Sequence, residues 1–176
     1  KTILIIGGSL GAKTINESIE KNLLQFQQNN LQIIWQTGKV YYDGIIERTK
    51  NIDLSSIKIQ QFIREMNMAY AAADIVVSRA GALSISELCI IGKPSILIPS
   101  PNVSEDHQTK NAMALVTKNA AILIKDVEAK DTIDTTILNL LQDETKLIEL
   151  ANNIKTLAKS NAATEIVTAI LQDINH

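Results

Sequence analysis

A run of small, hydroxylated and charged residues in the middle of the chain has the chemistry of a phosphate site. The run consists of Ser78, Arg79, Ala80, Gly81, Ala82, Leu83, Ser84, Ile85, Ser86 and Glu87. It joins an apolar strand to a helix, and Gly81 permits an open backbone at that junction. The amide N–H groups of residues 82–84 can therefore bind an anion, and the hydroxyls of Ser84 and Ser86 can add donors. We expect this run to be the central binding segment for a nucleotide diphosphate.

Two charged residues flank this run, and each has more than one interpretation. Glu87 lies about one turn into the helix, where the helix dipole alone favours a carboxylate. A carboxylate beside phosphates is repulsive unless it accepts hydrogen bonds, and the vicinal hydroxyls of a ribose are suitable donors. We therefore favour ribose binding for Glu87. Two roles fit Arg79 equally well: pairing with the diphosphate, or holding the loop by donating hydrogen bonds to its carbonyl groups.

A glycine-rich loop follows the first apolar run of the chain. It reads Gly7, Gly8, Ser9, Leu10, Gly11 and Ala12. Glycines allow a sharp turn and close approach of a ligand, the helix start behind them favours phosphate, and Ser9 supplies a hydroxyl donor. The spacing matches neither the dinucleotide fingerprint nor a P-loop. Phosphate binding and simple helix packing explain this loop equally well.

A third polar loop covers residues 99–112 and opens another helix. Gln108 and Asn111 are three residues apart and share a helix face, with His107 beside them. Side-chain amides both donate and accept hydrogen bonds, which suits sugar hydroxyls. An ordinary surface helix with Asp106 near its N-cap explains the same residues, and for this loop alone that simpler interpretation is preferred.

Apolar runs that alternate with helical periodicities predict the elements that position these loops. We expect strands at residues 3–6, 31–35, 57–60, 75–77, 95–98 and 121–124, and helices at 16–28, 40–50, 64–73, 83–91, 106–118, 132–141, 144–158 and 162–174. This alternation predicts an α/β fold, a Rossmann-like doubly wound parallel sheet of six strands in the order 3-2-1-4-5-6. Such sheets bind ligands beyond the carboxyl ends of their strands near the switch point between strands 1 and 4, which selects the three loops.

The composition fits one globular domain and argues against several functions. The chain has 176 residues, of which 45% are apolar and 20% charged, and its net charge of −2 argues against nucleic-acid binding. One cysteine, Cys89, allows no internal disulfide, and the two histidines, His107 and His176, are too far apart in sequence to favour a zinc site. No apolar run approaches the roughly 20 residues of a membrane span, and no signal peptide is recognised. We expect a cytoplasmic location, and a start at Lys1 suggests a piece of a longer protein.

Six short sequences match a known family in order and spacing over nearly the whole chain. They are GGSLGA at 7–12, QTGK at 36–39, FI at 62–63, AYAAADIVVSRAGALSISEL at 69–88, GKPSILIPSP at 92–101 and DHQTKNA at 106–112. Together they resemble the C-terminal half of the MurG family of bacterial peptidoglycan glycosyltransferases. The SRAGALSISE stretch with its downstream HQxxNA is highly specific to that family. The resemblance implies a hexosyltransferase that moves N-acetylglucosamine from its UDP donor to undecaprenyl-diphosphate-linked N-acetylmuramyl-pentapeptide.

The resemblance also implies which residues bind the donor. The diphosphate would lie at the helix start of residues 82–84, and Glu87 would bind the ribose hydroxyls. Uracil would meet the backbone of Ile63, with Phe62 shaping its pocket and Met66 near it. The implied donor contacts are Ser9, Phe62, Ile63, Met66, Arg79, Ala82, Leu83, Ser84, Ile85, Ser86, Glu87, His107, Gln108 and Asn111.

The same resemblance implies that residues 1–176 are the C-terminal, UDP-sugar-binding half of a two-domain GT-B enzyme. Gln108 would read the N-acetylglucosamine, with His107 and Asn111 nearby. The acceptor site, the catalytic base and a membrane-contacting hydrophobic patch belong to the family's N-terminal domain, so this chain alone would bind donor without catalysing transfer. No catalytic residue is assigned here, and no metal or cofactor is implied. The full-length protein would lie on the cytoplasmic face of the bacterial membrane.

Two other interpretations share the same features. Another UDP-sugar transferase, or a UDP-sugar epimerase of the same fold, would use the same donor loops. A non-catalytic nucleotide-binding module would keep the fold without the reaction. Tighter binding of UDP-glucose than of UDP-N-acetylglucosamine favours the first, and absence of UDP binding by a folded sample favours the second.

Overall fold

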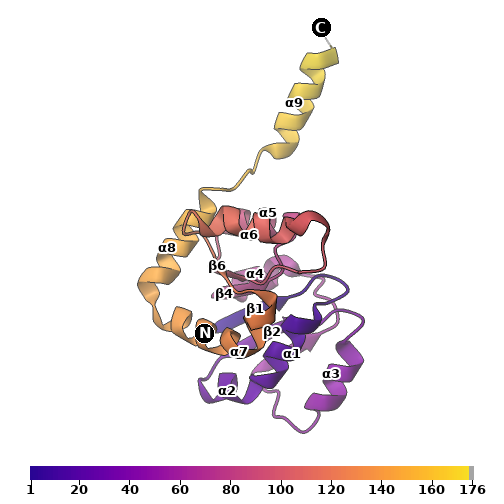
Figure 1. Ribbon diagram of the computed structural model, residues 1–176, viewed down its shortest axis with the longest axis vertical. Helices are drawn as coiled ribbons and strands as arrows, with labels where there is room; N and C mark the ends of the chain where they lie inside the picture. Colours follow the sequence, from indigo (N-terminus) through magenta and orange to yellow (C-terminus); the bar gives the residue numbers. More distant parts are fainter. Residues whose placement is uncertain (175–176) are drawn as a thin grey trace.

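The computed structural model describes residues 1–174, apart from the side chain of Ser104, and places helices on both faces of a parallel sheet (Figure 1). The strands are β1 (Thr2–Ile6), β2 (Gln32–Gln36), β3 (Ile57–Gln60), β4 (Ile75–Ser78), β5 (Ser95–Leu97) and β6 (Ile122–Leu123). They form one sheet in the order β3-β2-β1-β4-β5-β6, with parallel pairing throughout. The predicted fold class and strand order are confirmed. His176 lies outside the described residues.

Two layers of helices pack against the sheet because successive strand residues face opposite sides. The first layer contains α1 (Lys13–Lys21), α2 (Leu23–Gln28), α3 (Tyr42–Thr49) and α7 (Ala129–Gln142), and the second contains α4 (Met66–Ala72), α5 (Ala82–Ile91) and α6 (His107–Val116). In β1, Ile3 and Ile5 join the buried cluster of the first layer, whereas Leu4 and Ile6 join that of the second. Helix α8 (Glu144–Lys155) contributes to both clusters.

At the amino end of the sheet, Thr2 and Asp74 hold the two central strands together by two hydrogen bonds, one of them to the Asp74 side chain. The amide of Thr2 donates to the Asp74 carboxylate at 2.7 Å, and the amide of Asp74 donates to the Thr2 carbonyl at 2.8 Å. These bonds place β1 beside β4, with Ile3 opposite Ile75. The strand order reverses at this pair, so the switch point of the sheet lies at the opposite, carboxyl end of the same two strands.

The first helix was predicted as one segment over residues 16–28, and this is wrong. The chain forms α1 and α2 with a break at Asn22, whose backbone leaves the helical region at φ −110° and ψ 10°. Two side chains bond back to the preceding turn: the Ser18 hydroxyl donates to the Thr14 carbonyl, and the Asn22 amide donates to the Ser18 carbonyl. Such back-bonding competes with the helical ladder and bends it.

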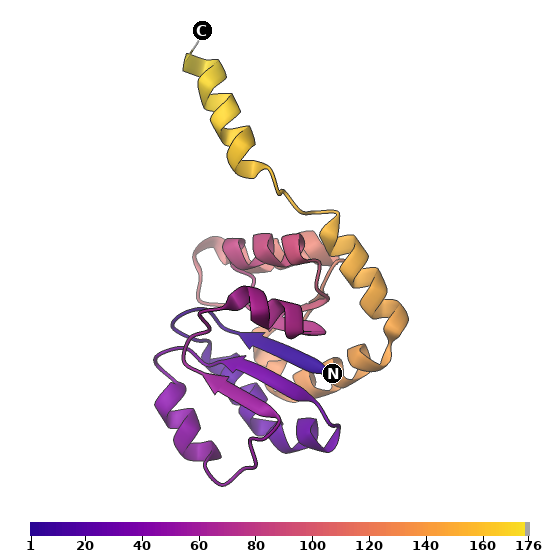
Figure 2. The same cartoon turned by 180° about the vertical axis from the view of Figure 1, so that it is seen from behind.

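Helix α9 (Ala162–Ile174) projects away from the body of the domain (Figures 1 and 2). Its exposed apolar residues include Ile166, Val167, Ile170 and Ile174. In the part of the chain that the structure describes, no helix has both the length and the apolarity needed to cross a bilayer.

Candidate functional site

The three polar loops selected from the sequence meet in one cleft beyond the carboxyl ends of β1, β4 and β5. The cleft has a volume of about 470 Å³. Its lining includes Gly8 and Gly11 from the first loop, Arg79, Gly81 and Ser84 from the second, and Ser100, Asn102 and Gln108 from the third. The cleft lies at the predicted switch point, so the sheet topology brings together segments that are far apart in sequence.

The start of α5 supplies donors to this cleft. Gly81 is the N-cap residue with φ −66° and ψ 149°, and the first turn-closing bond runs from the Ile85 amide to the Gly81 carbonyl at 2.9 Å. Among the described residues, no group accepts from the amides of residues 82–84, and Leu83 is 82% exposed. Free N–H groups at a helix start form an anion site. This is the arrangement expected for the diphosphate.

Two of the three glycines of the first loop, Gly8 and Gly11, have different reasons to be glycine. Gly8 has φ +85°, and a Cβ built on it would meet nothing within 4 Å, so its backbone is open to a ligand. Gly11 has φ +88°, and its Cβ would lie 2.1 Å from the carbonyl oxygen of Thr37. Packing therefore explains Gly11, and open approach fits Gly8. Ser9 between them is exposed, and its carbonyl accepts from the Lys39 amide at 3.3 Å.

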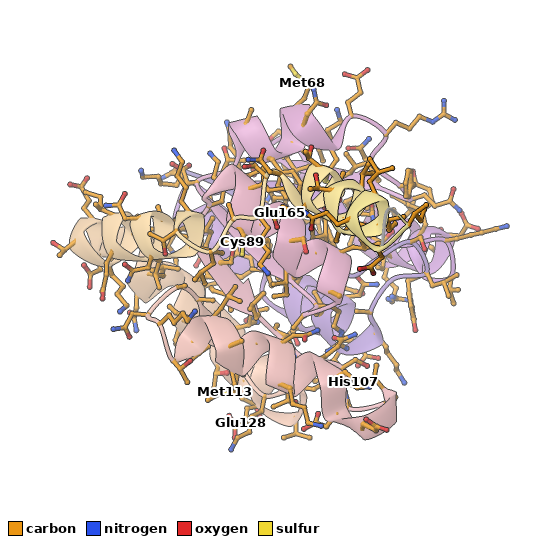
Figure 3. All side chains as sticks on the ribbon, turned by 90° about the horizontal axis from the view of Figure 1, so that it is seen from above. Met68, Cys89, His107, Met113, Glu128 and Glu165 are labelled. Atoms are coloured by element: carbon orange, nitrogen blue, oxygen red, sulfur yellow. The ribbon has the colours of Figure 1, made fainter. Side chains whose placement is uncertain are left out.

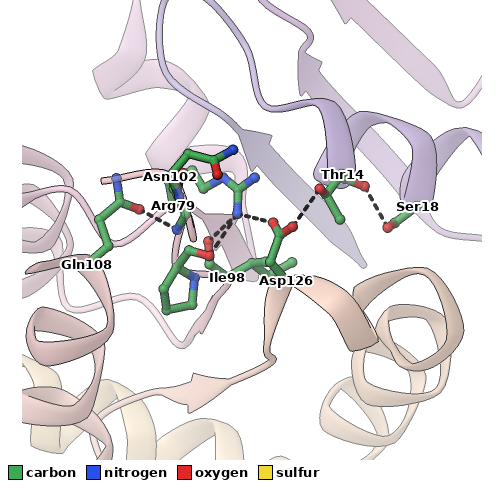
Figure 4. A network of polar contacts seen from close by, with 9 residues as sticks. Thr14, Ser18, Arg79, Ile98, Asn102, Gln108 and Asp126 are labelled. Atoms are coloured by element: carbon green, nitrogen blue, oxygen red, sulfur yellow. Dashed lines mark hydrogen bonds and ion pairs between the residues drawn. The ribbon is translucent and has the colours of Figure 1, made fainter. Parts of the chain in front are cut away.

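Arg79 holds the loops together from the side of the cleft (Figure 4). Its Nη1 donates to the carbonyls of Ile98 at 2.9 Å and Pro99 at 3.0 Å, and it pairs with the carboxylate of Asp126. Asp126, in the 3-10 turn after β6, also accepts from the Thr14 hydroxyl at 2.8 Å. Of the two roles open to Arg79, these contacts favour locking the loops. The charge of Arg79 is balanced by the carboxylate of Asp126.

Replacing Asp126 with alanine is expected to lower the free energy of unfolding by about 3 kcal/mol, because Arg79 loses its partner in a poorly solvated place. The two side chains are 14% and 15% exposed. Asp131 is the matched control, since its ion pair with Lys21 leaves it 79% exposed. Urea denaturation should find Asp131→Ala close to the unsubstituted chain. Equal losses in the two variants would contradict the role assigned to Asp126.

The third loop is braced by the amides predicted to read a sugar. Gln108 accepts from the Ser100 amide at 2.9 Å, and the Asn111 side chain donates to the Ala80 carbonyl at 3.1 Å. Each therefore keeps one polar atom for a ligand, the Gln108 NH₂ group and the Asn111 carbonyl oxygen. His107 stands at the exposed start of α6, on the rim of the molecule (Figure 3), 3.6 Å from the Glu105 carboxylate.

Helix α6 begins one residue later than predicted. Glu105 and Asp106 both have φ 53°, in the left-handed region, so the helix starts at His107. Asp106 occupies the N-cap position, but its carboxylate accepts from the Thr109 hydroxyl at 2.6 Å instead of a helix amide.

The predicted uracil contacts lie beside a second hollow, at the start of α4. Phe62 and Ile63 line this hollow of about 590 Å³, together with Met68. The Ile63 amide donates to the buried Gln36 side chain at 2.8 Å, and the Gln36 amide donates to the Gly8 carbonyl at 3.1 Å. The Ile63 carbonyl is therefore the backbone group left for a base. Sequence reasoning missed the bracing role of Gln36, although a polar residue ending a buried strand is a signal for one.

Glu87 has a partner that sequence reasoning also missed. The Tyr70 hydroxyl donates to Glu87 Oε2 at 2.9 Å, and this bond joins α4 to α5. Burial raises the pKa of Tyr70, and its hydrogen bond to Glu87 raises it further. Met66 lies one turn before Tyr70 on the same face of α4 and packs against the same buried cluster. No local spacing signals the contact between Tyr70 and Glu87, because the two residues are 17 apart in sequence.

Ile85 and Ser86 line neither the cleft nor the hollow beside α4. They line a groove between α5 and α6 that also includes Cys89 and Leu115. The Ser86 hydroxyl donates to the Ala82 carbonyl of its own helix at 3.0 Å. The structure therefore does not bring these two side chains together with the other predicted donor contacts.

A doubly wound parallel sheet, with a glycine-rich loop and a helix start at its switch point, defines a Rossmann-like α/β domain. Comparison with known proteins gives the family. Residues 2–166 match the glycosyltransferase family 28 C-terminal domain, and the chain belongs to this family.

Two relatives extend this finding. A protein of Cytophaga hutchinsonii named UDP-N-acetylglucosamine--N-acetylmuramyl-(pentapeptide) pyrophosphoryl-undecaprenol N-acetylglucosamine transferase is 51% identical over 174 residues, which are 99% of this chain and 46% of that protein. The crystal structure of Acinetobacter baumannii MurG superposes with a TM-score of 0.83 at 31% identity, covering 97% of this chain and 49% of that one. The chain thus spans about half the length of the relatives it matches. The resemblance drawn from the sequence motifs is confirmed.

A more distant structure shares the fold. Staphylococcus aureus MnaA, solved with UDP, superposes with a TM-score of 0.75 at 14% identity, over 99% of this chain and 46% of that one.

Proposed function

We propose that residues 1–176 are the donor domain of an inverting glycosyltransferase of peptidoglycan synthesis. The full enzyme would move N-acetylglucosamine from UDP-N-acetylglucosamine to undecaprenyl-diphosphate-linked N-acetylmuramyl-pentapeptide. The observation that carries this proposal is the unpaired helix start of α5 on the cleft, in a chain that is 51% identical to a transferase of that name.

The geometry suggests how this half contributes to the reaction. When the acceptor hydroxyl attacks the anomeric carbon of the sugar, the bond from that carbon to the diphosphate oxygen breaks. The leaving diphosphate then gains negative charge. The amides of residues 82–84 would donate hydrogen bonds to the leaving diphosphate, and such fixed donors stabilise a transition state without reorganising. The open backbone at Gly8 lets the phosphates approach closely. Glu87 would bind the ribose, and the Ile63 carbonyl would accept from the N3–H group of uracil.

The remaining roles are divided between the third loop of this chain and the N-terminal domain. The free atoms of Gln108 and Asn111 would bind the sugar, and His107 on the rim would contact the donor. No catalytic base is assigned to this chain. The acceptor site, the base and peripheral attachment to the inner face of the bacterial membrane would come from the N-terminal domain.

Calorimetry on the 176-residue chain tests the proposal. We expect UDP to bind, UDP-N-acetylglucosamine to bind more tightly than UDP-glucose, and GDP to bind at least about tenfold more weakly than UDP, since a purine does not fit contacts shaped for uracil. The chain alone should transfer no sugar. A preference for UDP-glucose would point to another UDP-sugar enzyme, and a folded chain without UDP binding would point to a different nucleotide-binding module.

A further inference from the structure

We propose that Tyr70 is a positioning residue that holds the Glu87 carboxylate in the orientation needed to accept hydrogen bonds from a ribose. Tyr70 on α4 and Glu87 on α5 would then act together in binding the ribose. This inference rests on the proposed function, because it takes the ligand to be a uridine diphosphate.

Tyr70 is held by packing and Glu87 is not, so Tyr70 is the residue that orients the other in this contact. Tyr70 is 5% exposed and belongs to the buried cluster that includes Ile63 and Leu88, so its ring is fixed by packing. Glu87 is exposed on α5, and its Oε2 atom accepts from the Tyr70 hydroxyl at 2.9 Å. A rigid donor therefore orients a side chain that is otherwise mobile in solvent.

The remaining atoms of Glu87 suit vicinal hydroxyls. A carboxylate has two oxygens and about four lone-pair sites, and the phenol uses one of them. Oε1 and the free site on Oε2 remain for two hydroxyl donors on adjacent carbons. Burial and the contact with Glu87 both raise the pKa of Tyr70, so the phenol stays protonated and keeps donating at neutral pH.

A purely structural role for Tyr70 predicts a different result. If the hydrogen bond only held α4 against α5, its loss would lower the stability of the domain and would weaken the binding of every ligand of the cleft equally. A positioning role instead affects only ligands that carry ribose hydroxyls. Uridine diphosphate and its 2′,3′-dideoxy analogue differ in those hydroxyls alone, so they separate the two roles.

The experiment measures both ligands by calorimetry with the unsubstituted chain, Tyr70→Phe and Tyr42→Phe. We expect Tyr70→Phe to weaken UDP binding by about fivefold, the loss that corresponds to immobilising one flexible side chain on binding, and to leave the dideoxy analogue unchanged. Tyr42 lies on α3, outside the donor contacts, and its variant should bind both ligands like the unsubstituted chain.

A double variant completes the test. In a Glu87→Ala background, Tyr70→Phe should cause no further loss of UDP affinity, because no carboxylate remains to be oriented. Equal weakening of both ligands, no weakening of UDP, or a persisting loss in the double variant would overturn the inference while leaving the proposed function in place. An unsubstituted, folded chain that binds no UDP would overturn the proposed function and the inference together.

Discussion

Replacing Glu87 with alanine is expected to weaken UDP binding by about 100-fold, the effect of losing two hydrogen bonds to a charged acceptor. The carboxylate lies one turn beyond the amides that would hold the diphosphate, and Tyr70 keeps one of its oxygens in place. Removing it leaves the ribose hydroxyls without these acceptors. The measurement is the dissociation constant of UDP by calorimetry, with circular dichroism to establish that the variant is folded.

The control for this variant is another exposed glutamate on a helix. Glu144 is exposed in the first turn of α8 and is not among the predicted donor contacts. Glu144→Ala should keep the full affinity for UDP. If Glu87→Ala also kept it, the ribose role of Glu87 would be lost, and helix stabilisation would remain as its explanation.

Gly11→Ala is expected to lower the free energy of unfolding by about 4 kcal/mol, the sum of left-handed backbone strain and overpacking. The added methyl would lie 2.1 Å from the Thr37 carbonyl oxygen, with Gly11 at φ +88°. That carbonyl cannot easily retreat, because it accepts from the buried Asn16 amide at 2.8 Å. Urea denaturation monitored by circular dichroism measures the loss.

The variant Gly8→Ala separates the two contributions to this loss of stability, backbone strain and steric overlap of the added methyl group. Gly8 has nearly the same φ, +85°, but its methyl would meet nothing within 4 Å. We expect a loss of only about 1 kcal/mol, from backbone strain alone. Similar losses in the two variants would mean that the contact between the first loop and Thr37 contributes little.

The sheet was predictable from sequence because its strands are short apolar runs bounded by turn residues. All six were found, and their order followed from alternation with helices. The break at Asn22 was missed, since it arises from the back-bonding of Ser18 and Asn22 side chains and not from hydrophobic periodicity. The start of α6 was missed by one residue because Asp106 adopts a left-handed conformation that an aspartate N-cap does not require.

The site was predictable in its loops and less so in its individual atoms. Glycines and hydroxyls at strand ends identified the cleft, but sequence does not reveal which polar atoms the protein itself already uses. Arg79 and Asp126 are 47 residues apart, the Ile63 amide and Gln36 are 27 apart, and Tyr70 and Glu87 are 17 apart. Such pairs become visible only when the fold brings distant segments together. They nevertheless decide which groups remain for a ligand.

The reciprocal contact between Thr2 and Asp74 has a consequence for how the domain folds. It closes a segment of 72 residues, and β1 cannot take its place at the centre of the sheet until β4 has been synthesised. Closing a long loop costs chain entropy before the new strand pairing offsets it, and parallel pairing of distant strands is correspondingly slow. We therefore expect the β1–β4 pairing to limit the folding rate. The pairing of β1 with β4 creates the switch point at which the cleft lies, so the same slow step also delays formation of the cleft.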